Sequence, residues 1–442
     1  MIIFSHTLTP RLQYVVDFLS KYYGTPIRII CDDEKYLANP DPFKINYSFH
    51  RLSNNEIWIN AHVLLFETAV RHVKIECFTQ TALSSSKGAY KAFFKTEGDF
   101  GFDILAAIFF LITRYEEYLP HKKDIFGRYA HENSLAFNED FLHQPLVNTW
   151  LNDFAELLKQ RFPELKLNLP GFSFLPTYDI DMAWSFKNKG FNRNAGAILK
   201  LFFTARWGKM LRRIKVLRRK RDDPHDAYQW MDNLHSKFSL KPIYFFLVAQ
   251  QTGKYDKNID VNNPEFRSLI ESINLNYKIG LHPSFASSEN ATLLPKEKAT
   301  LEDIVGHPVH SSRQHYITLD FPTTYRRLIT LGITEDYSMG YGGINGFRAS
   351  IATPFSWYDL KNEMQTSLTV YPFCFMEATS YYEQKITSEE ALNDLMHYYE
   401  AVKKVGGTLI TIWHNGFLGT DSEFNGWRDA YERFVQNVAA AR

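Results

Sequence analysis

The stretch FLPTYDID, residues 174–181, joins an apolar strand pattern to two carboxylates, Asp179 and Asp181. Apolar segments typical of strands recur at residues 243–248, 278–281, 333, 368–371 and 408–413. Helical patterns lie between or after them, at residues 226–238, 264–274, 296–305, 323–330, 388–405 and 427–440. This alternation predicts βα units around a parallel sheet, which is either open or closed into a barrel.

The residues before this stretch follow a looser pattern of short elements. Strand patterns occur at residues 2–4, 27–30, 55–59 and 73–78, and helical patterns at 12–23, 103–118 and 145–161. Residues 163–170 contain two prolines and are typical of a linker. A chain of 442 residues is long enough for two or three domains. We therefore expect a smaller α/β domain at residues 1–165 and a main domain at residues 171–442.

Polar side chains follow five of the predicted strands at the point where each strand ends. They are Asp179 and Asp181, His282, Arg313 with His315, Asp336, and His414 with Asn415. The carboxyl ends of parallel strands meet at one edge of a sheet or barrel, so we expect these side chains to gather there.

This set of side chains predicts metal-assisted hydrolysis of an amide or an ester. Carboxylates and imidazoles are ligands of a divalent ion such as zinc. A catalytic site of this kind leaves one coordination position for water, whose pKa the ion lowers. A carboxylate that is not a ligand can then act as general base, and a free imidazole can act as general acid.

Four short motifs carry a resemblance to a known family. TYDID at residues 177–181, LHPS at 281–284, SRQHY at 312–316 and IWHN at 412–415 resemble, in order and spacing, the motifs of the polysaccharide deacetylases, the NodB-like carbohydrate esterases. The segments DYSMGY, GFRAS and PFSWYDL resemble a branch with an extra N-terminal domain. The resemblance covers residues 171–442 and, more loosely, the domain before them. It implies a distorted (β/α)7 barrel that removes N- or O-linked acetyl groups from a carbohydrate or glycan precursor.

The resemblance also implies a role for each motif residue. Asp179 would be the catalytic base, and Arg313 would orient its carboxylate. Asp181 and His282 would bind the metal, although Ile180 separates the two aspartates here. His414 would protonate the leaving group.

Three further residues are candidates for substrate binding, namely Tyr316, Asp336 and Trp413. A backbone N–H near Tyr316 would help the ion to hold the oxyanion. Asp336 has a second interpretation, an ion pair with Arg313 that only connects two strand ends.

One departure from the family pattern concerns the metal ligands. The family places a second histidine four residues after the first, and Ala286 occupies that position here. His315 could replace it as the third ligand, and His307 and His310 are nearby alternatives. If none of them binds, the fold would bind glycan without turning it over, which is the alternative hypothesis.

Composition and motifs exclude several other classes. The 50 Lys+Arg and 49 Asp+Glu residues nearly cancel, which argues against a nucleic-acid-binding protein. Three widely spaced cysteines and the absence of a secretory signal pattern favour a cytoplasmic protein. The motifs HExxH, GxxxxGK[ST] and GxGxxG are absent, and DYSMG lacks the first glycine of a serine-hydrolase GxSxG turn.

One segment departs from the neutral average. The sequence RWGKMLRRIKVLRRKR, which begins at Arg206 and ends at Arg221, contains nine Lys/Arg and no acid, and ILKLFF precedes it. Either it is an exposed helical insertion with a solvated cationic face, or it is a basic amphipathic helix. In the second case it would bind a lipid-linked glycan or an anionic membrane surface, and the protein would lie at the inner face of the membrane.

Overall fold

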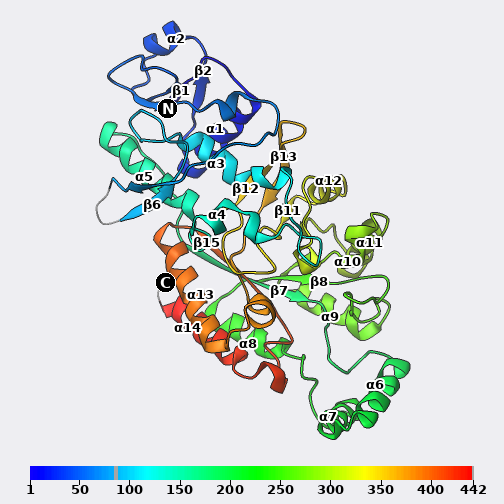
Figure 1. The fold of residues 1–442 in the computed structure, drawn as a ribbon. Helices are drawn as coiled ribbons and strands as arrows, with labels where there is room; N and C mark the ends of the chain where they lie inside the picture. The colour runs from blue at the N-terminus through cyan, green and yellow to red at the C-terminus, as the bar shows by residue number, and fades with distance from the viewer. Residues whose placement is uncertain (84–87, 441–442) are drawn as a thin grey trace.

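The computed structural model describes residues 1–83 and 88–440 and has a mixed α/β architecture, as the sequence predicts (Figure 1). It contains a four-stranded sheet, a nine-stranded sheet and a two-stranded hairpin. Within the described ranges, no helix combines the length and the apolar character needed to cross a membrane.

The N-terminal sheet is parallel throughout, in the order β2-β1-β3-β4. Its strands are β1 (Ile2–Phe4), β2 (Arg28–Ile30), β3 (Lys44–Ser48) and β4 (Ile57–Asn60). Helix α1 (Pro10–Tyr23) connects the first two strands. Its first turn is capped by Thr9, whose side chain accepts from the N–H of Leu12, and it ends at Gly24 in a left-handed conformation.

Among the remaining N-terminal elements is a strongly apolar helix, α3 (Ile104–Ile112), whose nine residues are all buried. The others are α2 (Asp33–Ala38), β5 (Phe78–Thr81), β6 (Ala89–Ala92), α4 (Leu135–Asn138) and α5 (Leu146–Arg161). The strand predicted at residues 73–78 is wrong, because ladder pairing begins only at Phe78, which lies opposite Ala92. The alternating pattern of residues 73–77 has no neighbouring strand in the described structure to pair with.

The large sheet has the order β12-β13-β11-β10-β9-β8-β7-β15-β14, and every pair except β12 with β13 is parallel. The strands are β7 (Ser173–Ile180), β8 (Ile243–Phe246), β9 (Lys278–Leu281), β10 (Ser311–Ser312), β11 (Glu335–Asp336), β12 (Phe355–Asp359), β13 (Met364–Val370), β14 (Phe375–Met376) and β15 (Thr408–His414). The parallel βα prediction is therefore confirmed, although β10, β12 and β14 were not expected, and the strand predicted at residue 333 begins only at Glu335.

The segment between β13 and β14 forms hydrogen bonds with two parts of the large sheet that are far apart in the strand order, near β11 and at β15. Between β13 and β14, the N–H groups of Tyr371 and Phe373 donate to the carbonyls of Asp336 and Met339. The N–H of Cys374 donates to Ile410 in β15. Residues 371–374 thus connect the β11 side of the sheet with its β15 side.

Helices cover the large sheet, and all except one short helix at residues 285–289 lie at the predicted places. They are α8 (Tyr228–Phe238), α9 (Pro264–Asn274), α10 (Phe285–Glu289), α11 (Leu293–Val305), α12 (Thr323–Thr330), α13 (Ser388–Lys404) and α14 (Trp427–Ala440). Helix α13 begins with a full capping box formed by Thr387 and Glu390. Two further helices, α6 (Phe191–Phe203) and α7 (Trp207–Leu217), project from the body (Figure 1).

The N-terminal part packs on the outer end of the large sheet. The buried guanidinium of Arg11 in α1 forms an ion pair with Glu363, next to β13, and the hydroxyl of Tyr14 donates to the carbonyl of Ser356 in β12. Buried side chains of both parts belong to one apolar core. Helix α1 therefore covers the edge of the sheet where β12 lies.

Candidate metal centre and active site

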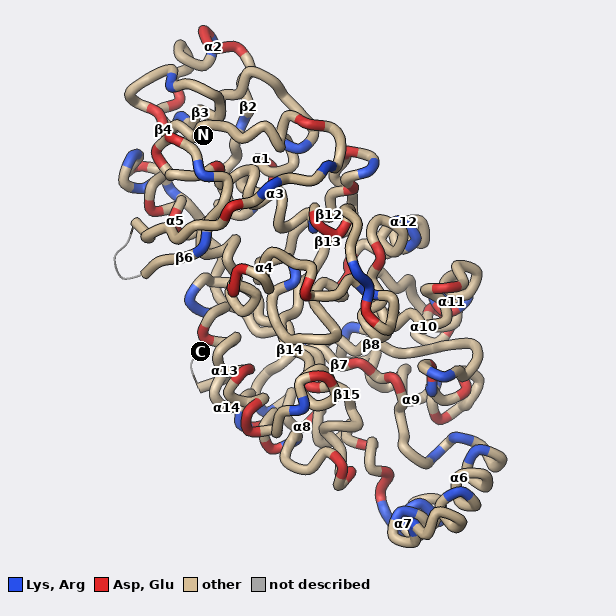
Figure 2. Tube along the Cα trace, in the orientation of Figure 1, with Lys and Arg blue, Asp and Glu red and all other residues tan. Residues whose placement is uncertain are grey.

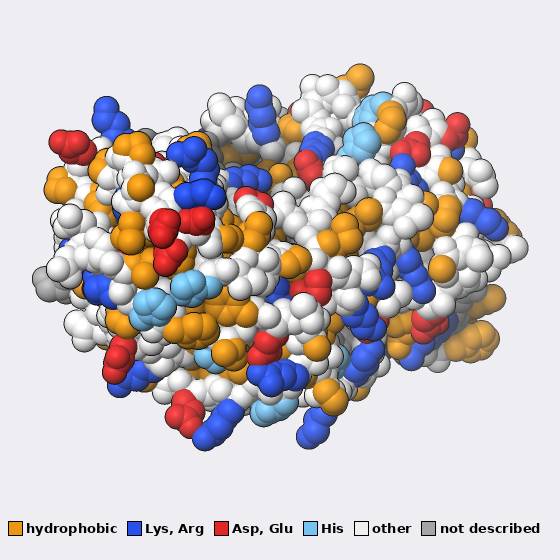
Figure 3. Space-filling view, turned by 90° about the horizontal axis from the view of Figure 1, so that it is seen from above, with side chains coloured by type: hydrophobic (Ala, Val, Ile, Leu, Met, Phe, Trp, Pro, Cys, Tyr) orange, Lys and Arg blue, Asp and Glu red, His pale blue; other side chains and the backbone are white. Residues whose placement is uncertain are grey.

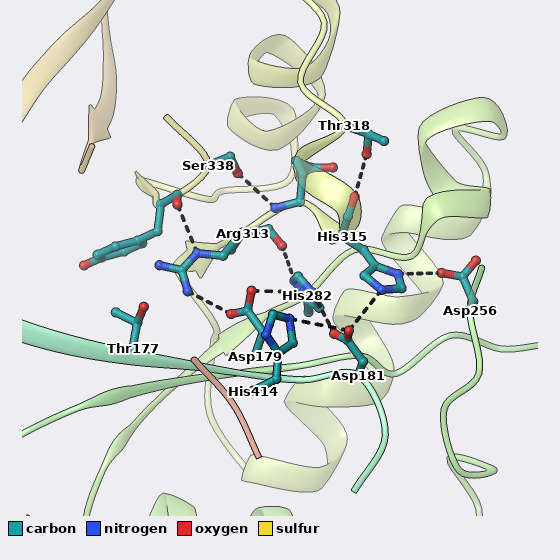
Figure 4. Close-up of polar contacts among 12 residues, drawn as sticks. Thr177, Asp179, Asp181, Asp256, His282, Arg313, His315, Thr318, Ser338 and His414 are labelled. Carbon is teal, nitrogen blue, oxygen red and sulfur yellow. Dashed lines mark hydrogen bonds and ion pairs between the residues drawn. The ribbon is translucent and has the colours of Figure 1, made fainter. Parts of the chain in front are cut away.

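A cavity of about 260 Å³ opens where β7, β9, β10 and β15 end. Its lining brings together Asp179, Asp181, His282, His315 and His414, all of which the sequence places after strands (Figure 4). These strands are neighbours in the sheet, apart from β8 between β7 and β9. These five side chains therefore gather at one edge of the sheet, as the sequence predicts.

Asp181 lies at the centre of three imidazoles (Figure 4). Its Oδ1 lies 3.1 Å from Nε2 of His282, and its Oδ2 lies 3.4 Å from Nε2 of His315. Nε2 of His414 is slightly farther from Oδ2, at 3.6 Å. The side chain of Asp181 is 35% exposed, whereas His282 and His315 are buried.

The other ring nitrogen of each of the two buried histidines already has a partner. Nδ1 of His282 lies 2.6 Å from the carbonyl oxygen of Arg313, which can only accept a hydrogen bond. Nδ1 of His315 lies 2.9 Å from Oδ1 of Asp256. With a proton on each Nδ1, the neutral rings direct the Nε2 lone pairs toward Asp181.

This arrangement fits a divalent metal ion. Ligand atoms bound tetrahedrally at roughly 2.0–2.1 Å lie roughly 3.3–3.4 Å apart, close to the separations around Asp181. One ligand atom from each of Asp181, His282 and His315 lies within 4.8 Å of the other two. Nε2 of His282 and Oδ1 of Asp181 are buried without a hydrogen-bond partner. Two lone pairs that face each other in this way need a proton or a metal ion between them.

The charges of the cluster shift the pKa values of its members. Burial alone would raise the pKa of Asp181, but the neighbouring imidazoles of His315, His414 and His282 hold it well below its usual range. Burial alone would lower the pKa of His315, but Asp181 and Asp256 raise it to about 9. A metal ion would have to displace the proton from Nε2 of His315 in order to bind there.

Asp256 is a functional candidate that the sequence analysis missed. It lies in the loop after β8, and its carboxylate accepts the N–H groups of Phe285 and Ala286 in addition to Nδ1–H of His315. It does not directly follow the predicted strand at residues 243–248, so only the spatial contact identifies it. It fixes the tautomer and the orientation of His315.

We expect Asp256→Asn to weaken zinc binding about tenfold to 100-fold, because a polarised imidazole partner of a metal ligand is lost. Titration of the metal-free protein against a chromophoric chelator measures this change. Asp260→Asn, an exposed aspartate in the same loop, is the matched control and should bind zinc like the wild type. Equal affinities of all three proteins would contradict a role of Asp256 in the site.

Asp179 occupies a separate position beside the metal cluster. Nη1 of Arg313 donates to its Oδ1 over 2.8 Å, and its Oδ2 lies 3.8 Å from Nε2 of His282. The guanidinium of Arg313 also donates through Nε to the carbonyl of Tyr337 and stacks 4.4 Å above the ring of Phe245. Arg313 therefore fixes one oxygen of Asp179 and leaves the other directed toward the cluster.

His414 forms a second histidine–carboxylate pair. Oε1 of Glu377 accepts both Nδ1–H and the backbone N–H of His414, each over 2.7 Å. Burial alone would lower the pKa of His414, but Glu377 and Asp181 raise it to about 10. The ring is therefore protonated at neutral pH and can give up a proton from Nε2. Glu377, next to β14, was also missed, because the sequence pattern did not predict that strand.

Tyr316 lines the cavity on a strained turn. Its backbone and that of Ile317 are both left-handed, with φ of 56°, which is costly for a β-branched residue. Nη1 of Arg128, from the N-terminal part, donates to the Tyr316 carbonyl over 2.8 Å, and the ring of Phe126 contacts that of Tyr316. Arg128 also lines the cavity.

Two predicted substrate-binding residues lie outside the cavity lining. Trp413 is buried and packs against Phe375, Trp427 and Tyr431. Asp336 is buried and accepts from the hydroxyls of Ser312 and Ser338, so it connects strand ends, although not through Arg313. These placements do not favour contact with substrate.

The alternative ligands His307 and His310 also lie away from the cluster. Both are exposed, and their ring nitrogens contact Asn274, Pro308 and Gly332. Ala286, at the position of the missing family histidine, uses its backbone N–H to hold Asp256. His315 is instead the histidine that lies beside Asp181 together with His282, and Asp256 orients it.

Comparisons with known proteins complete the description. Residues 1–163 match the model of a family of unknown function, DUF7033. A search of curated proteins finds no match. Solved structures that resemble the chain include three described as polysaccharide deacetylases, from Mycobacterium smegmatis, Bacillus cereus and Pseudomonas aeruginosa PAO1.

The likeness to these three structures is distant. Their sequence identities are 14%, 11% and 10%, in the order just given. The matches cover 61%, 60% and 61% of this chain and 85%, 88% and 85% of the other chains, with TM-scores of 0.39, 0.30 and 0.37. At such scores the likeness carries no functional argument, so the function is inferred from the side chains of the site.

Proposed function

We propose that this protein is a metal-dependent hydrolase that removes acetyl groups, N- or O-linked, from a carbohydrate. The observation that supports this most is the cluster of Asp181, His282 and His315, with its buried unpartnered ligand atoms, beside a second, Arg-bound carboxylate. A structural metal site needs only its ligands. A catalytic site also leaves a coordination position for water and uses a base and an acid near the metal. Asp179 and His414 provide both.

In this proposal each side chain has one task. Asp181, His282 and His315 hold the ion, most simply zinc, because two imidazoles and a carboxylate match its preferred ligands. A divalent ion bound there would supply Lewis acidity toward a carbonyl oxygen and toward water. Asp179 accepts a proton through Oδ2, while Arg313 holds Oδ1. His414, held by Glu377, donates a proton to the leaving nitrogen or oxygen.

The cavity wall supports a sugar as the substrate. Its lining includes the rings of Tyr316, Tyr382, Phe417 and Phe424, and aromatic faces pack well against the apolar faces of sugar rings. The backbone N–H of Tyr316 is the proposed donor to the oxyanion. The cavity is small, so a single acylated residue of a longer glycan would enter it.

The same proposal includes the domain division. Residues 171–442 would form a distorted (β/α)7 barrel, which is supported by the contacts of residues 371–374 with both sides of the strand order. Residues 1–165 would form an accessory domain, supported by their own parallel sheet and by the family match that ends at residue 163. Arg128 and Phe126 would let this domain complete the wall of the site.

Acetate release from N-acetylated and O-acetylated oligosaccharides tests the proposal. We expect release by the zinc-loaded protein and loss of nearly all of it after chelation, because the oxyanion and the attacking water would both lose the ion's assistance. Addition of zinc should restore the rate. The measurement is enzymatic detection of acetate before chelation, after it and after reloading.

A specific outcome would favour the alternative hypothesis. If the zinc-loaded protein binds these oligosaccharides tightly but releases no acetate, the chain is a glycan-binding protein with a deacetylase-like site. A protein that neither binds zinc nor releases acetate would contradict both the metal site and the reaction.

A further inference from the structure

The two helices α6 and α7 form a hairpin that projects from the body of the molecule (Figure 1). A short turn at Thr204 and Ala205 joins them. The hairpin belongs to an insertion at residues 183–224, between β7 and α8, and none of the side chains assigned to the proposed chemistry lies in it. Its composition differs from that of the rest of the surface in two ways.

First, its tip exposes large apolar side chains in a continuous ridge. Leu199, Phe202 and Phe203 follow helical spacing in α6, and Trp207 and Leu211 follow it in α7. Phe203 is 81% exposed, and the other four are about half exposed (Leu199 57%, Phe202 49%, Trp207 48%, Leu211 52%). The rings of Phe202 and Trp207 lie 4.9 Å apart, so the ridge crosses the turn without interruption.

Second, the hairpin carries nine Lys/Arg between residues 206 and 221 and no acid (Figure 2). Two of them have carboxylate partners, Arg212 with Asp421 and Lys209 with Glu423. Exposed cations without a carboxylate partner among the described residues are Arg206, Lys215, Arg218, Arg219, Lys220 and Arg221. The face of the body seen in Figure 3 instead mixes both signs of charge with apolar side chains.

The hairpin is held in place before it meets any partner. Nη1 of Arg212 contacts Oδ1 of Asp421 at 3.3 Å, which ties α7 to the body. Nε of Arg213 donates to Oδ1 of Asn194 in α6, and its guanidinium stacks over the ring of Phe186. Binding would therefore cost little ordering of the backbone.

We propose that this hairpin binds the surface of an anionic phospholipid membrane. The apolar ridge would enter the boundary between headgroups and acyl chains, and the unpaired cations would contact the headgroup phosphates. A nucleic acid would use the cations but would leave Leu199 and Leu211 in water, so the combination favours a lipid surface.

The position of the hairpin connects this surface with the site. The insertion leaves the body after Met182 and returns at His225, and both residues line the cavity. A protein bound through α6 and α7 would hold the cavity near the lipid surface, so its substrate would be a glycan attached to that membrane. This last step rests on the proposed function, whereas membrane binding itself does not.

Vesicle flotation with the full chain tests membrane binding. We expect the protein to float with phosphatidylcholine vesicles that contain phosphatidylglycerol, to remain unbound with pure phosphatidylcholine, and to dissociate as salt is raised. Reversal of Lys215, Arg218 and Arg219 to Glu should weaken binding by at least about 100-fold, since each cation near an anionic surface contributes about a fivefold gain and each new carboxylate is repelled. Phe203→Asp should also reduce binding at least about tenfold, because it places a charge in the apolar ridge.

Matched controls separate these effects from general surface changes. Leu275→Asp alters an apolar side chain that is 83% exposed on another helix end, and Lys296, Lys361 and Lys404 to Glu reverses three exposed cations elsewhere. Both controls should float like the wild type. All these variants should release acetate from a soluble oligosaccharide at the wild-type rate, so loss of flotation alone isolates the hairpin from the reaction.

Several results would overturn the proposal. These are no flotation of the wild type with anionic vesicles, equal flotation with neutral ones, and unchanged flotation of the Lys215/Arg218/Arg219 variant. Equal loss in the matched controls would also overturn it. So would hairpin-dependent dimerisation, or binding of RNA, without any flotation, because the ridge would then have a protein or nucleic-acid partner.

Discussion

Asp179→Asn should lower the rate of acetate release about 10²- to 10⁴-fold while zinc remains bound, because it removes a general base but no metal ligand. Asparagine has nearly the same shape, and its amide oxygen can still accept the hydrogen bond from Nη1 of Arg313. The buried guanidinium therefore keeps a partner, and the fold should persist. Acetate release under saturating zinc, together with the zinc content of the purified variant, measures both parts of the prediction.

The neighbouring aspartate provides the contrast. Asp181→Asn should lose both zinc and activity, since Asp181 is the carboxylate at the centre of the three imidazoles. If Asp179→Asn releases acetate at the wild-type rate, or loses as much zinc as Asp181→Asn, the assignment of Asp179 as the base is wrong.

His315→Ala should weaken zinc binding at least about 10³-fold and abolish acetate release, because two protein ligands remain where a catalytic site needs three. The side chain is buried, with its two ring nitrogens directed at Asp256 and Asp181. Its removal also leaves one oxygen of Asp256 without the Nδ1–H donor, although two backbone N–H groups still contact that carboxylate. Zinc affinity by chelator competition and acetate release give the two readouts.

His310→Ala is the matched control for His315→Ala. His310 lies only five residues before His315 in the sequence and is exposed. The control should bind zinc and release acetate like the wild type. Zinc binding by His315→Ala with unchanged affinity would show that another group completes the site, and the third-ligand assignment would then be wrong.

The sequence predicts the elements of residues 171–442 better than those of the N-terminal part. The bounds of β9, α9, α12 and α14 agree with the structure residue for residue. Their apolar periodicity coincides with capping residues such as Asn263 and Pro264 at the start of α9. The predicted strand at residues 73–78 fails because alternation shows which face could be buried, whereas a strand also needs a neighbour to pair with.

Some residues of the candidate site could be predicted from the sequence and others could not. Residues that end a strand, such as Asp179, His282 and His414, could be found because the sheet edge collects them. Asp256 could not be found, because it lies in a loop beyond the end of β8, nor could Glu377, because the sequence does not predict β14 before it. Trp413 and Asp336 were predicted to contact substrate because they lie close to motif residues in the sequence. The structure does not support these contacts, since proximity to a motif does not decide which way a side chain points in a strand.

The contact of Arg128 with Tyr316 has a consequence for work with the isolated main part of the chain. Residues 171–442 alone would lack the side chain that holds the Tyr316 carbonyl, and the left-handed turn beside the ligand cluster would lose a support. They would also uncover β12, an edge strand that α1 now shields, and leave Glu363 without Arg11. An uncovered edge invites pairing between copies. The N-terminal residues therefore cover an edge strand and also contribute to the wall of the cavity, so experiments on the site should use the full chain.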